Sequence, residues 1–411
     1  MARLKEYNGH YCESEYEYAF IGFLEAEGWK YSSGNNIHRV TKRDVLIADD
    51  FKKFIADTNP DLTEDEVKQI YDNVRLVGAE SNFATLHKVY GWMVNGVQFT
   101  SQDGLPRMIS LIDFDNWDKN IFRVVNQFTV EYTNNGQKEN RRPDVLLFVN
   151  GMPLCVVELK NPVDANATIY DAWEQINIRY WRDIPHLLHY CPLACISDGV
   201  KTRLGTVRTP YEHFYAWRRV NEGDVVSTLP FAETETMIKG VYTPERFVEI
   251  FRDYIYFQDS IYDSDEVEIV CRYPQFFAAK LLKQSIVNSV VTRSGKGGTY
   301  FGATGCGKTY TMAFLARQLA LRCTDIPEIG SPTIILIVDR DELQKQGSNL
   351  FTKSKEFLNL GEVSVVKNRT QLRQELGARQ SGGFYICTIQ KFCDREDDKI
   401  GLINDRQNII C

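Results

Sequence analysis

Apolar residues in the first part of the chain recur at helical spacing. In the segment SEYEYAFIGFLEAEGWKY, Phe20 and Leu24 lie four positions apart on one helical face, which predicts a helix over about residues 14–27. A polar stretch read as helical follows to about residue 95. The first quarter of the chain is therefore predicted to be mainly helical.

The pattern changes from Val97 to short, β-rich apolar runs separated by turn residues. These runs are MISLIDF, NIFRVVNQFTVEY, DVLLFVN and PLCVVELK. Turn signals at 134–136 (NNG) and 150–151 (NG) predict hairpins between strands. After them the sequence predicts a helix (TIYDAWEQINIRYWRDI), a strand (CPLACIS) and an amphipathic helix over about 243–258.

An acidic run, DSDEVE at 263–268, separates this region from a stretch of alternating strands and helices. Strand patterns there lead into the glycine-rich GATGCGKT and recur in TIILIVDR, EVSVVK and FYICTI, with helical patterns between them. Such alternation is typical of a parallel sheet. The sequence thus predicts an α/β protein with a first domain over residues 1–260 and a second over residues 261–411.

Composition narrows the class of protein. Of the 411 residues, 43% are hydrophobic and 25% are charged, which is ordinary for a globular protein and excludes disorder as its main state. A net charge of -7 argues against a nonspecific coat on nucleic acid but allows a local basic groove. The ten cysteines form no CxxC pair, and the apolar runs are too short to cross a bilayer. We therefore expect a cytoplasmic protein with reduced cysteines and no membrane partner.

Charged residues stand at the ends of two apolar strands in RRPDVLLFVNGMPLCVVELKNP. Asp144 precedes one strand, and Glu158 and Lys160 occupy alternate positions near the end of the next, so they face the same side. The NG turn brings Asp144 alongside them. Two carboxylates beside a lysine suit phosphodiester hydrolysis, in which the carboxylates hold Mg²⁺ and the lysine orients or deprotonates the attacking water. The alternative is a simple ion pair at a strand end.

This segment resembles the PD-(D/E)xK nuclease motif of the motor (restriction) subunits of type I restriction–modification enzymes. Similar segments run from about residue 11 to the end, among them ESEYEYAFIGFLEAEGW, LIDFDNWDKNIFRVVNQFTVEY, IPHLLHY and ISDGVKTRLGTVRTPYEHFYAWR. The resemblance implies a Mg²⁺-dependent endonuclease domain with Asp144 and Glu158 as metal ligands and Lys160 as a catalytic residue. It also implies a glutamate from the opening helix, Glu17 or, as the alternative, Glu13.

The family's next helix usually carries a Gln-xxx-Tyr element that supports the site, and the sequence departs from it here. Gln175 and Tyr180 are five positions apart, one more than in the family. On an ideal helix this offset turns Tyr180 about 140° away from Gln175, whereas Arg179 shares the face of Gln175. We therefore expect Gln175 to serve the site and Gln175→Ala to impair cleavage more than Tyr180→Phe. Whether Tyr180 or Arg179 takes the tyrosine's place is left open.

The stretch GATGCGKT at 302–309 matches the phosphate loop GxxxxGK[ST], after a short predicted strand and before the helical YTMAFLARQLA. Its glycines let backbone N–H groups curl round phosphates at the start of a helix. Lys308 would reach the β and γ phosphates, and Thr309 would ligate Mg²⁺. The alternative is a flexible glycine turn, which this context disfavours. The predicted ATP site consists of Gly302, Thr304, Gly305, Gly307, Lys308 and Thr309.

The second domain resembles the first RecA-like lobe of a superfamily 2 DNA translocase. The resemblance implies that Gln275 reads adenine and that four residues approach the DNA backbone, namely Arg340, Gln346, Thr388 and Lys391. In such a translocase the DEAH-type box and the arginine finger would lie past Cys411. Because hydrolysis needs these groups, we expect the 411-residue chain to bind ATP weakly without turning it over.

The residues and the resemblance together predict a restriction subunit that cleaves unmodified foreign double-stranded DNA, with ATP required in the complete enzyme. Its partners would be the modification and specificity subunits. Several arginines could form a basic rim around the site, namely Arg141, Arg142, Arg203, Arg208, Arg218 and Arg219. Two alternatives remain: a repair or recombination helicase–nuclease, told apart by its use of linear DNA, and an assembly module whose silent nuclease site binds no Mg²⁺.

Overall fold

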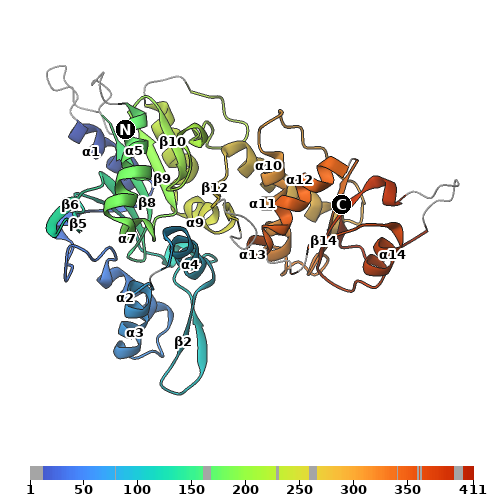
Figure 1. Ribbon diagram of the computed structural model, residues 1–411, viewed down its shortest axis with the longest axis horizontal. Coiled ribbons are helices and arrows are strands. Elements are labelled where there is room, and N and C mark those ends of the chain that lie inside the picture. The colour runs from blue at the N-terminus through green and yellow to red at the C-terminus, as the bar shows by residue number, and fades with distance from the viewer. Residues whose placement is uncertain are drawn as a thin grey trace. The chain divides into compact units, whose positions relative to one another are not determined.

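The computed structural model describes residues 13–411 except 79, 161–167, 228–230, 259–265, 340, 359–360, 362 and 393–400, and it leaves out the side chains of residues 13, 341–346 and 356. The chain divides into two compact units (Figure 1), one of residues 1–252 with 268–270 and one of 253–267 with 271–411. The boundary predicted between residues 260 and 261 lies outside the described residues. The two predicted domains therefore stay a prediction.

A mixed sheet forms the centre of the first unit. Its strands in spatial order are β1 (Lys30–Ser33), β4 (Phe122–Asn126), β7 (Val145–Val149), β8 (Met152–Leu159), β9 (Leu193–Ser197) and β10 (Thr202–Thr206). β1 runs parallel to β4 and β8 parallel to β9, while the other neighbours are antiparallel. Every residue of β7 and β8 is buried, as expected for central strands covered on both faces.

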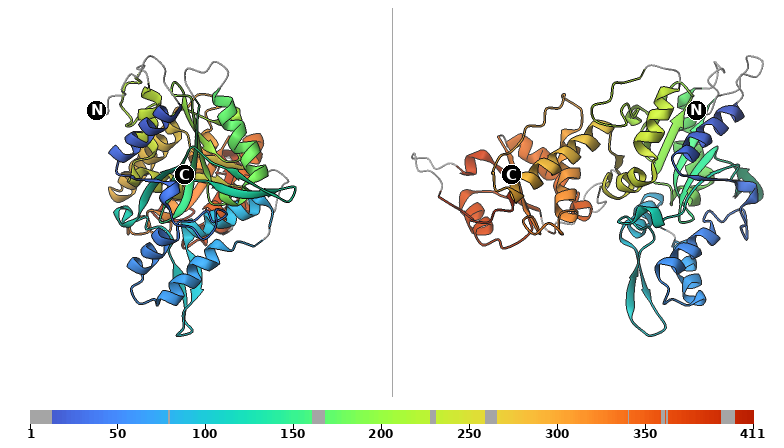
Figure 2. Two further views of the ribbon diagram at one scale, coloured as in Figure 1. Left: turned by 90° about the vertical axis from the view of Figure 1, so that its left-hand side faces the viewer. Right: turned by 180° about the vertical axis from the view of Figure 1, so that it is seen from behind.

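Helices cover both faces of this sheet. The described helices of this unit are α1 (Glu13–Ala26), α2 (Ala48–Thr58), α3 (Glu64–Arg75), α4 (Asn82–Asn95), α5 (Ile169–Glu174), α6 (Trp181–Asp183), α7 (Pro185–Leu188), α8 (Ala232–Val241) and α9 (Pro244–Asp253), of which α2 and α3 pack on each other beside the sheet. Figure 2 (left) shows α1 in blue and α8 in yellow-green on one side of the sheet and α5 in green on the other. Among the described residues, no helix is both long and apolar enough to span a membrane.

Two hairpins form where the sequence predicts them. The first joins β5 (Val130–Asn134) to β6 (Gln137–Arg141), and the second joins β7 to β8 through Asn150 and Gly151. Asn150 and Gly151 have φ of 50° and 76°, the left-handed pair that a tight two-residue turn requires. A Cβ at Gly151 would also collide with the carbonyl oxygen of Ile47. Both hairpin predictions are confirmed.

Two predictions about the first 260 residues are wrong in part. The helix predicted over 243–258 ends at Asp253, and β11 (Ile255–Phe257) follows, because aromatic and β-branched residues favour an extended strand. The stretch predicted to be helical up to residue 95 also contains β1, which pairs with β4. Short strands remain outside the central sheet, namely β2 (Val97–Thr100), β3 (Pro106–Ile109) and β12 (Glu268–Val270).

The second unit contains a parallel sheet, as predicted. Its strands in spatial order are β14 (Val363–Val365), β15 (Phe384–Thr388), β13 (Thr333–Val338) and β16 (Ile409–Ile410). Its helices are α10 (Tyr273–Val291), α11 (Lys308–Leu321), α12 (Asp341–Thr352), α13 (Lys355–Leu358) and α14 (Arg369–Gly377). Residues of β13, β15 and α14, among them Ile335, Cys387 and Leu376, share a buried core.

The strand predicted before the phosphate loop does not form. Residues 295–301 carry no strand, and the Phe301 side chain is 92% exposed. Only three residues, Thr299, Tyr300 and Phe301, stand between Gly298 and the phosphate loop, and the sheet pairs β13 with β15 and β16 without including them. A short extended segment without a partner strand has no hydrogen bonds to keep it in a sheet.

Candidate active site

The hairpin of β7 and β8 brings two carboxylates together. Asp144 stands directly before β7, and its Oδ2 accepts a hydrogen bond from the backbone N–H of Leu159 at 2.7 Å. The backbone N–H of Asp144 in turn points at Oε1 of Glu158, at 3.4 Å. Lys160 directly follows β8, and its Nζ lies 3.9 Å from Glu158 Oε2. The three residues that the sequence analysis grouped therefore lie side by side.

Glu158 is buried in a way that a carboxylate tolerates poorly. Its side chain is 0% exposed, and Oε2 has no hydrogen-bond partner among the described residues. Burial, and then the nearby Asp144 carboxylate, raise the pKa of Glu158 well above its usual value. Burial likewise raises the pKa of Asp144. Two carboxyl groups that resist ionisation together form a site at which a bound cation would be strongly stabilising.

Tyr180 reaches this site, contrary to the prediction from ideal helical spacing. Residues 175–180 form a π-helical turn, η3 (Gln175–Tyr180), between α5 and α6. The turn absorbs one extra residue, so Gln175 Nε2 donates to the Tyr180 hydroxyl at 2.8 Å and that hydroxyl donates to Glu158 Oε1 at 2.6 Å. Lys160 Nζ donates to Gln175 Oε1 at 3.2 Å. Arg179 instead points to Glu174 on the surface.

The opposite face of the same helix is fastened to the segment that follows β10. Trp173 Nε1 donates to the carbonyl oxygen of Thr209 at 2.9 Å, and Trp181 Nε1 donates to that of Val207 at 2.8 Å. Asn177 Nδ2 donates to both carbonyl oxygens. These side chains fix the rotation of the helix before, within and after the π-helical turn, so tertiary contacts select the turn.

Glu17 of α1 also belongs to this cluster. It is 7% exposed, and burial, with a smaller contribution from Asp144, raises its pKa. Its Oε1 accepts a hydrogen bond from Asn126 Nδ2 at 2.6 Å, and Asn126 Oδ1 accepts one from the Tyr31 hydroxyl at 3.0 Å. The sequence analysis missed Asn126, which the structure shows fully buried at the end of β4; its only signal in the sequence was an amide that ends an apolar run. The alternative, Glu13, has a side chain outside the described residues.

The donor set fits a hard divalent cation. Mg²⁺ is usually bound by one or two carboxylates and keeps several waters. Asp144 and Glu158 provide such a pair, and Glu158 Oε2 is buried without a partner among the described residues. The described residues contain no group of three or more His, Cys, Asp and Glu side chains already arranged around a metal position.

The phosphate loop opens α11 in the second unit. Gly305 and Gly307 have φ of 78° and 80°, which side chains with a Cβ rarely adopt. Lys308 Nζ donates to the carbonyl oxygens of Gly302 and Ala303 at 2.8 and 3.0 Å, so the loop curls round its lysine. Thr304 is exposed, and Thr309 is half-buried in the first turn of α11.

Gln275 lies under this loop and is 3% exposed. Its Nε2 donates to the carbonyl oxygen of Gly307 at 3.1 Å, and its Oε1 accepts from the backbone N–H of Arg272 at 2.8 Å. A Cβ at Gly307 would collide with this amide. Gln275 therefore braces the loop against the start of α10 while lying within reach of the predicted nucleotide site.

Two of the four residues predicted to approach DNA from the second unit can be described. Thr388 is buried at the end of β15, and Lys391 Nζ donates to the carbonyl oxygen of Val366 at 2.5 Å. Arg340 and the side chain of Gln346 lie outside the described residues. The approach of these four residues to DNA therefore stays a prediction.

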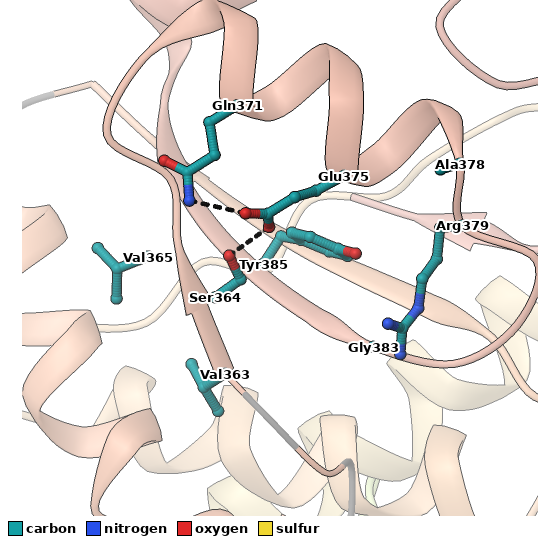
Figure 3. Close-up of a pocket in the computed structure, with 9 residues that line it drawn as sticks. All are labelled: Val363, Ser364, Val365, Gln371, Glu375, Ala378, Arg379, Gly383 and Tyr385. Atoms are coloured by element: carbon teal, nitrogen blue, oxygen red, sulfur yellow. Dashed lines mark hydrogen bonds between the residues drawn. The ribbon is translucent and has the colours of Figure 1, made fainter.

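A pocket of about 530 Å³ lies beside β14 and α14 in the second unit (Figure 3). Its Glu375 carboxylate accepts hydrogen bonds from Ser364 and Gln371 at 2.6 and 2.8 Å. No described residue of the phosphate loop lines this pocket, which is therefore distinct from the predicted ATP site.

Together these features define a two-unit α/β chain with a carboxylate and lysine site in one unit and a phosphate loop in the other. Residues 11–213 match the family model for the type I restriction enzyme R protein N terminus, and residues 274–411 match that for the SWI2/SNF2 ATPase. The predicted resemblance to the restriction subunits of type I enzymes is confirmed.

Curated relatives extend this similarity along the chain. The putative type I restriction enzyme MjaIXP endonuclease subunit of Methanocaldococcus jannaschii is 29% identical over 96% of this chain and 39% of its own length. The type I restriction enzyme HindI endonuclease subunit of Haemophilus influenzae is 28% identical over 97% of this chain and 38% of its own. The chain thus spans about two fifths of the length of these relatives.

Proposed function

We propose that the first unit is a Mg²⁺-dependent DNA endonuclease of the PD-(D/E)xK type. The observation that carries the proposal is the meeting of Asp144, Glu158 and Lys160 with a buried Glu158 oxygen that has no partner among the described residues. A surface ion pair would be hydrated and fully paired. This cluster is buried and sets two carboxylates beside one lysine, so a bound cation would offset the remaining negative charge.

In this proposal Asp144 and Glu158 would hold Mg²⁺, which lowers the pKa of a bound water and offsets charge on the scissile phosphate. Lys160 would face the attacking water and the developing negative charge. Gln175 fixes the Lys160 ammonium, and Tyr180 fixes one oxygen of Glu158, so neither reacting group needs to reorient. Glu17 would add a third negative charge at the same edge.

For the second unit we propose ATP binding at residues 302–309, as the first RecA-like lobe of a DNA translocase. The similarity to SWI2/SNF2 ATPases and the left-handed glycines of the loop support this assignment. For the larger protein that would contain this chain, we propose the restriction of unmodified foreign DNA in the cytoplasm. We propose that it acts together with modification and specificity subunits; the relatives are named endonuclease subunits, which supports an assembly with other subunits.

A nicking assay on supercoiled DNA tests the nuclease proposal. The chain is assayed with Mg²⁺, with and without the proposed partner subunits, and compared with Lys160→Ala and with the control Lys138→Ala, whose side chain is 77% exposed. Lys160→Ala should lose about 100-fold or more in rate because it removes a transition-state contact, and Lys138→Ala should cut normally. Normal cutting by Lys160→Ala would refute the proposal. Cutting of linear DNA alone would favour an end-degrading helicase–nuclease.

A further inference from the structure

A second polar pocket lies in the first unit, where the β5–β6 hairpin meets the helical turn after η3. Its volume is about 610 Å³, and its walls are Arg43, Tyr132, Thr133, Asn134, Glu139, Arg141, Arg182, Asp183, Pro185 and His186. Three guanidinium groups therefore face two carboxylates around one cavity. Neither the sequence motifs nor the proposed cleavage chemistry uses this pocket.

Both carboxylates of the pocket are already occupied by donors of the chain. Asp183 accepts hydrogen bonds from Arg141 Nε at 2.7 Å and from Arg182 Nε at 2.7 Å, and their contact keeps its pKa low. Glu139 accepts from the Tyr132 hydroxyl at 2.6 Å and from Asn134. These acceptors are satisfied and hold the arginines in place, and three arginines against two carboxylates leave one positive charge in excess.

The arginines keep donors for a ligand. A guanidinium has five N–H groups, more than Arg141 and Arg182 use on Asp183. The Arg141 guanidinium also stacks over the Tyr132 ring at 5.2 Å, which holds its plane in place. The side chain of Arg43 makes no hydrogen bond or ion pair with any other described residue. Pre-oriented, unsaturated guanidinium groups suit an oxyanion that accepts two hydrogen bonds side by side.

His186 adds an uncharged polar atom to the same wall. Its Nε2 is buried and has no hydrogen-bond partner among the described residues. Burial, and then the Arg43 charge, lower the pKa of His186 to about 4, so the imidazole is neutral near pH 7. A neutral imidazole can donate one N–H to a ligand while the arginines carry the charge.

The covalent chain limits the distance between this pocket and the candidate active site. Arg141 precedes Asp144 by three residues, and Asp183 follows Tyr180 by three residues in helical conformation. Three extended residues reach at most about 11 Å. Phosphates of one DNA strand succeed one another at about 3.4 Å along the helix axis. The pocket is therefore within a few nucleotides of a phosphate held at the active site.

We propose that this pocket binds a phosphodiester group of the DNA strand being cut, a few nucleotides from the scissile phosphate. The inference rests on the proposed nuclease function. It assigns a positioning task to Arg43, Arg141 and Arg182, which fix the register of the backbone without taking part in the chemistry.

Salt-dependent binding of a short DNA duplex by the purified chain without Mg²⁺ tests this proposal. Neutralising one phosphate changes the slope of log K against log salt by about 0.9. Arg43→Ala should therefore weaken binding at low salt and reduce the slope by about that amount, and Arg182→Ala should add to the loss. Arg43→Lys keeps the charge and should keep the slope. The control Lys138→Ala removes a charge from the same hairpin outside the pocket and should change the slope by less than a third as much.

The outcomes separate this inference from the nuclease proposal. Lys160→Ala should bind DNA with the parent's slope while losing cleavage, and Arg43→Ala should bind DNA more weakly and raise the KM for cleavage. Slopes of Arg43→Ala and Lys138→Ala that do not differ, or no duplex binding by the parent chain at low salt, would overturn the pocket assignment alone. Normal cutting by Lys160→Ala would overturn the nuclease proposal whatever the slopes.

Discussion

The hydroxyl of Tyr180 gives the sharpest test of the active-site geometry. Tyr180→Phe removes one oxygen atom from a side chain that is 1% exposed and leaves the ring in place. That oxygen donates to Glu158 Oε1 at 2.6 Å. Burial and the neighbouring Glu158 raise the pKa of Tyr180 well above its usual value, so the hydroxyl remains a donor throughout the working pH range.

The expected loss follows from the burial of both partners. A hydrogen bond to a charged group contributes about 1.5–3 kcal/mol, and each 1.36 kcal/mol corresponds to a factor of ten in rate. Among the described residues, Glu158 Oε1 would keep the long contact from the Asp144 backbone N–H at 3.4 Å. Tyr180→Phe should therefore slow cleavage by roughly 10–100-fold. Gln175→Ala breaks a longer, part-buried bond of 3.2 Å to Lys160 and should cost less, roughly 3–10-fold.

Single-turnover conversion of supercoiled to nicked DNA at saturating Mg²⁺ measures both variants. Tyr170→Phe is the matched control, because it makes the same change on the neighbouring helix at a side chain that is 47% exposed. This order of effects reverses the one expected from ideal helical spacing. A Tyr180→Phe rate within twofold of the parent, beside a tenfold loss for Gln175→Ala, would show that the hydroxyl contact does not serve catalysis.

Three further predictions concern stability, positioning and the nucleotide. The raised pKa of Glu158 means that the folded chain binds this proton more tightly than the unfolded chain, so the stability of the metal-free chain falls as pH rises through the folded pKa. Glu158→Gln should therefore raise the unfolding midpoint at pH 8 by several degrees, which is about 1–2 kcal/mol. The variant should lose this advantage at pH 5. Asn126→Leu removes the hydrogen bond to Glu17 and should slow cleavage about tenfold with an unchanged KM for DNA. In a Glu17→Ala background the same substitution should slow cleavage no further, which a double-mutant cycle measures. Lys308→Ala should weaken ATP binding by the chain, because it removes the ammonium group round which the phosphate loop curls, and equilibrium binding of ATP measures this.

Sequence patterns correctly predicted the features that depend on interactions between neighbouring residues. The Asn150–Gly151 turn, the alternation that puts Glu158 and Lys160 on one side, and the glycines of the phosphate loop all depend on a few neighbouring residues. The sequence could not supply the π-helical turn, because Trp173 and Trp181 select it by bonding to carbonyl oxygens some thirty residues away. The prediction from the five-position offset between Gln175 and Tyr180 assumed a uniform α-helix, and it therefore turned Tyr180 away from the site.

Other contacts were hidden for the same reason. Asn126 meets Glu17 only because α1 packs beside β4, and the hydrophobic pattern does not reveal which helix covers which strand. The predicted strand before the phosphate loop had a suitable aromatic pattern, yet pattern alone cannot tell whether a sheet edge is available to pair with it. Metal binding and the roles of the site residues stay predictions.

Because of the π-helical turn, the number of residues in this helix does not by itself set the relative orientation of its two ends. One extra residue in a continuous α-helix would rotate everything beyond it by about 100°. Here the wide turn takes up that rotation within residues 175–180, so the Tyr180 hydroxyl reaches both Gln175 and Glu158. A chain built like this tolerates a gained or lost residue between two cooperating side chains, and families that share such a site need not share its spacing.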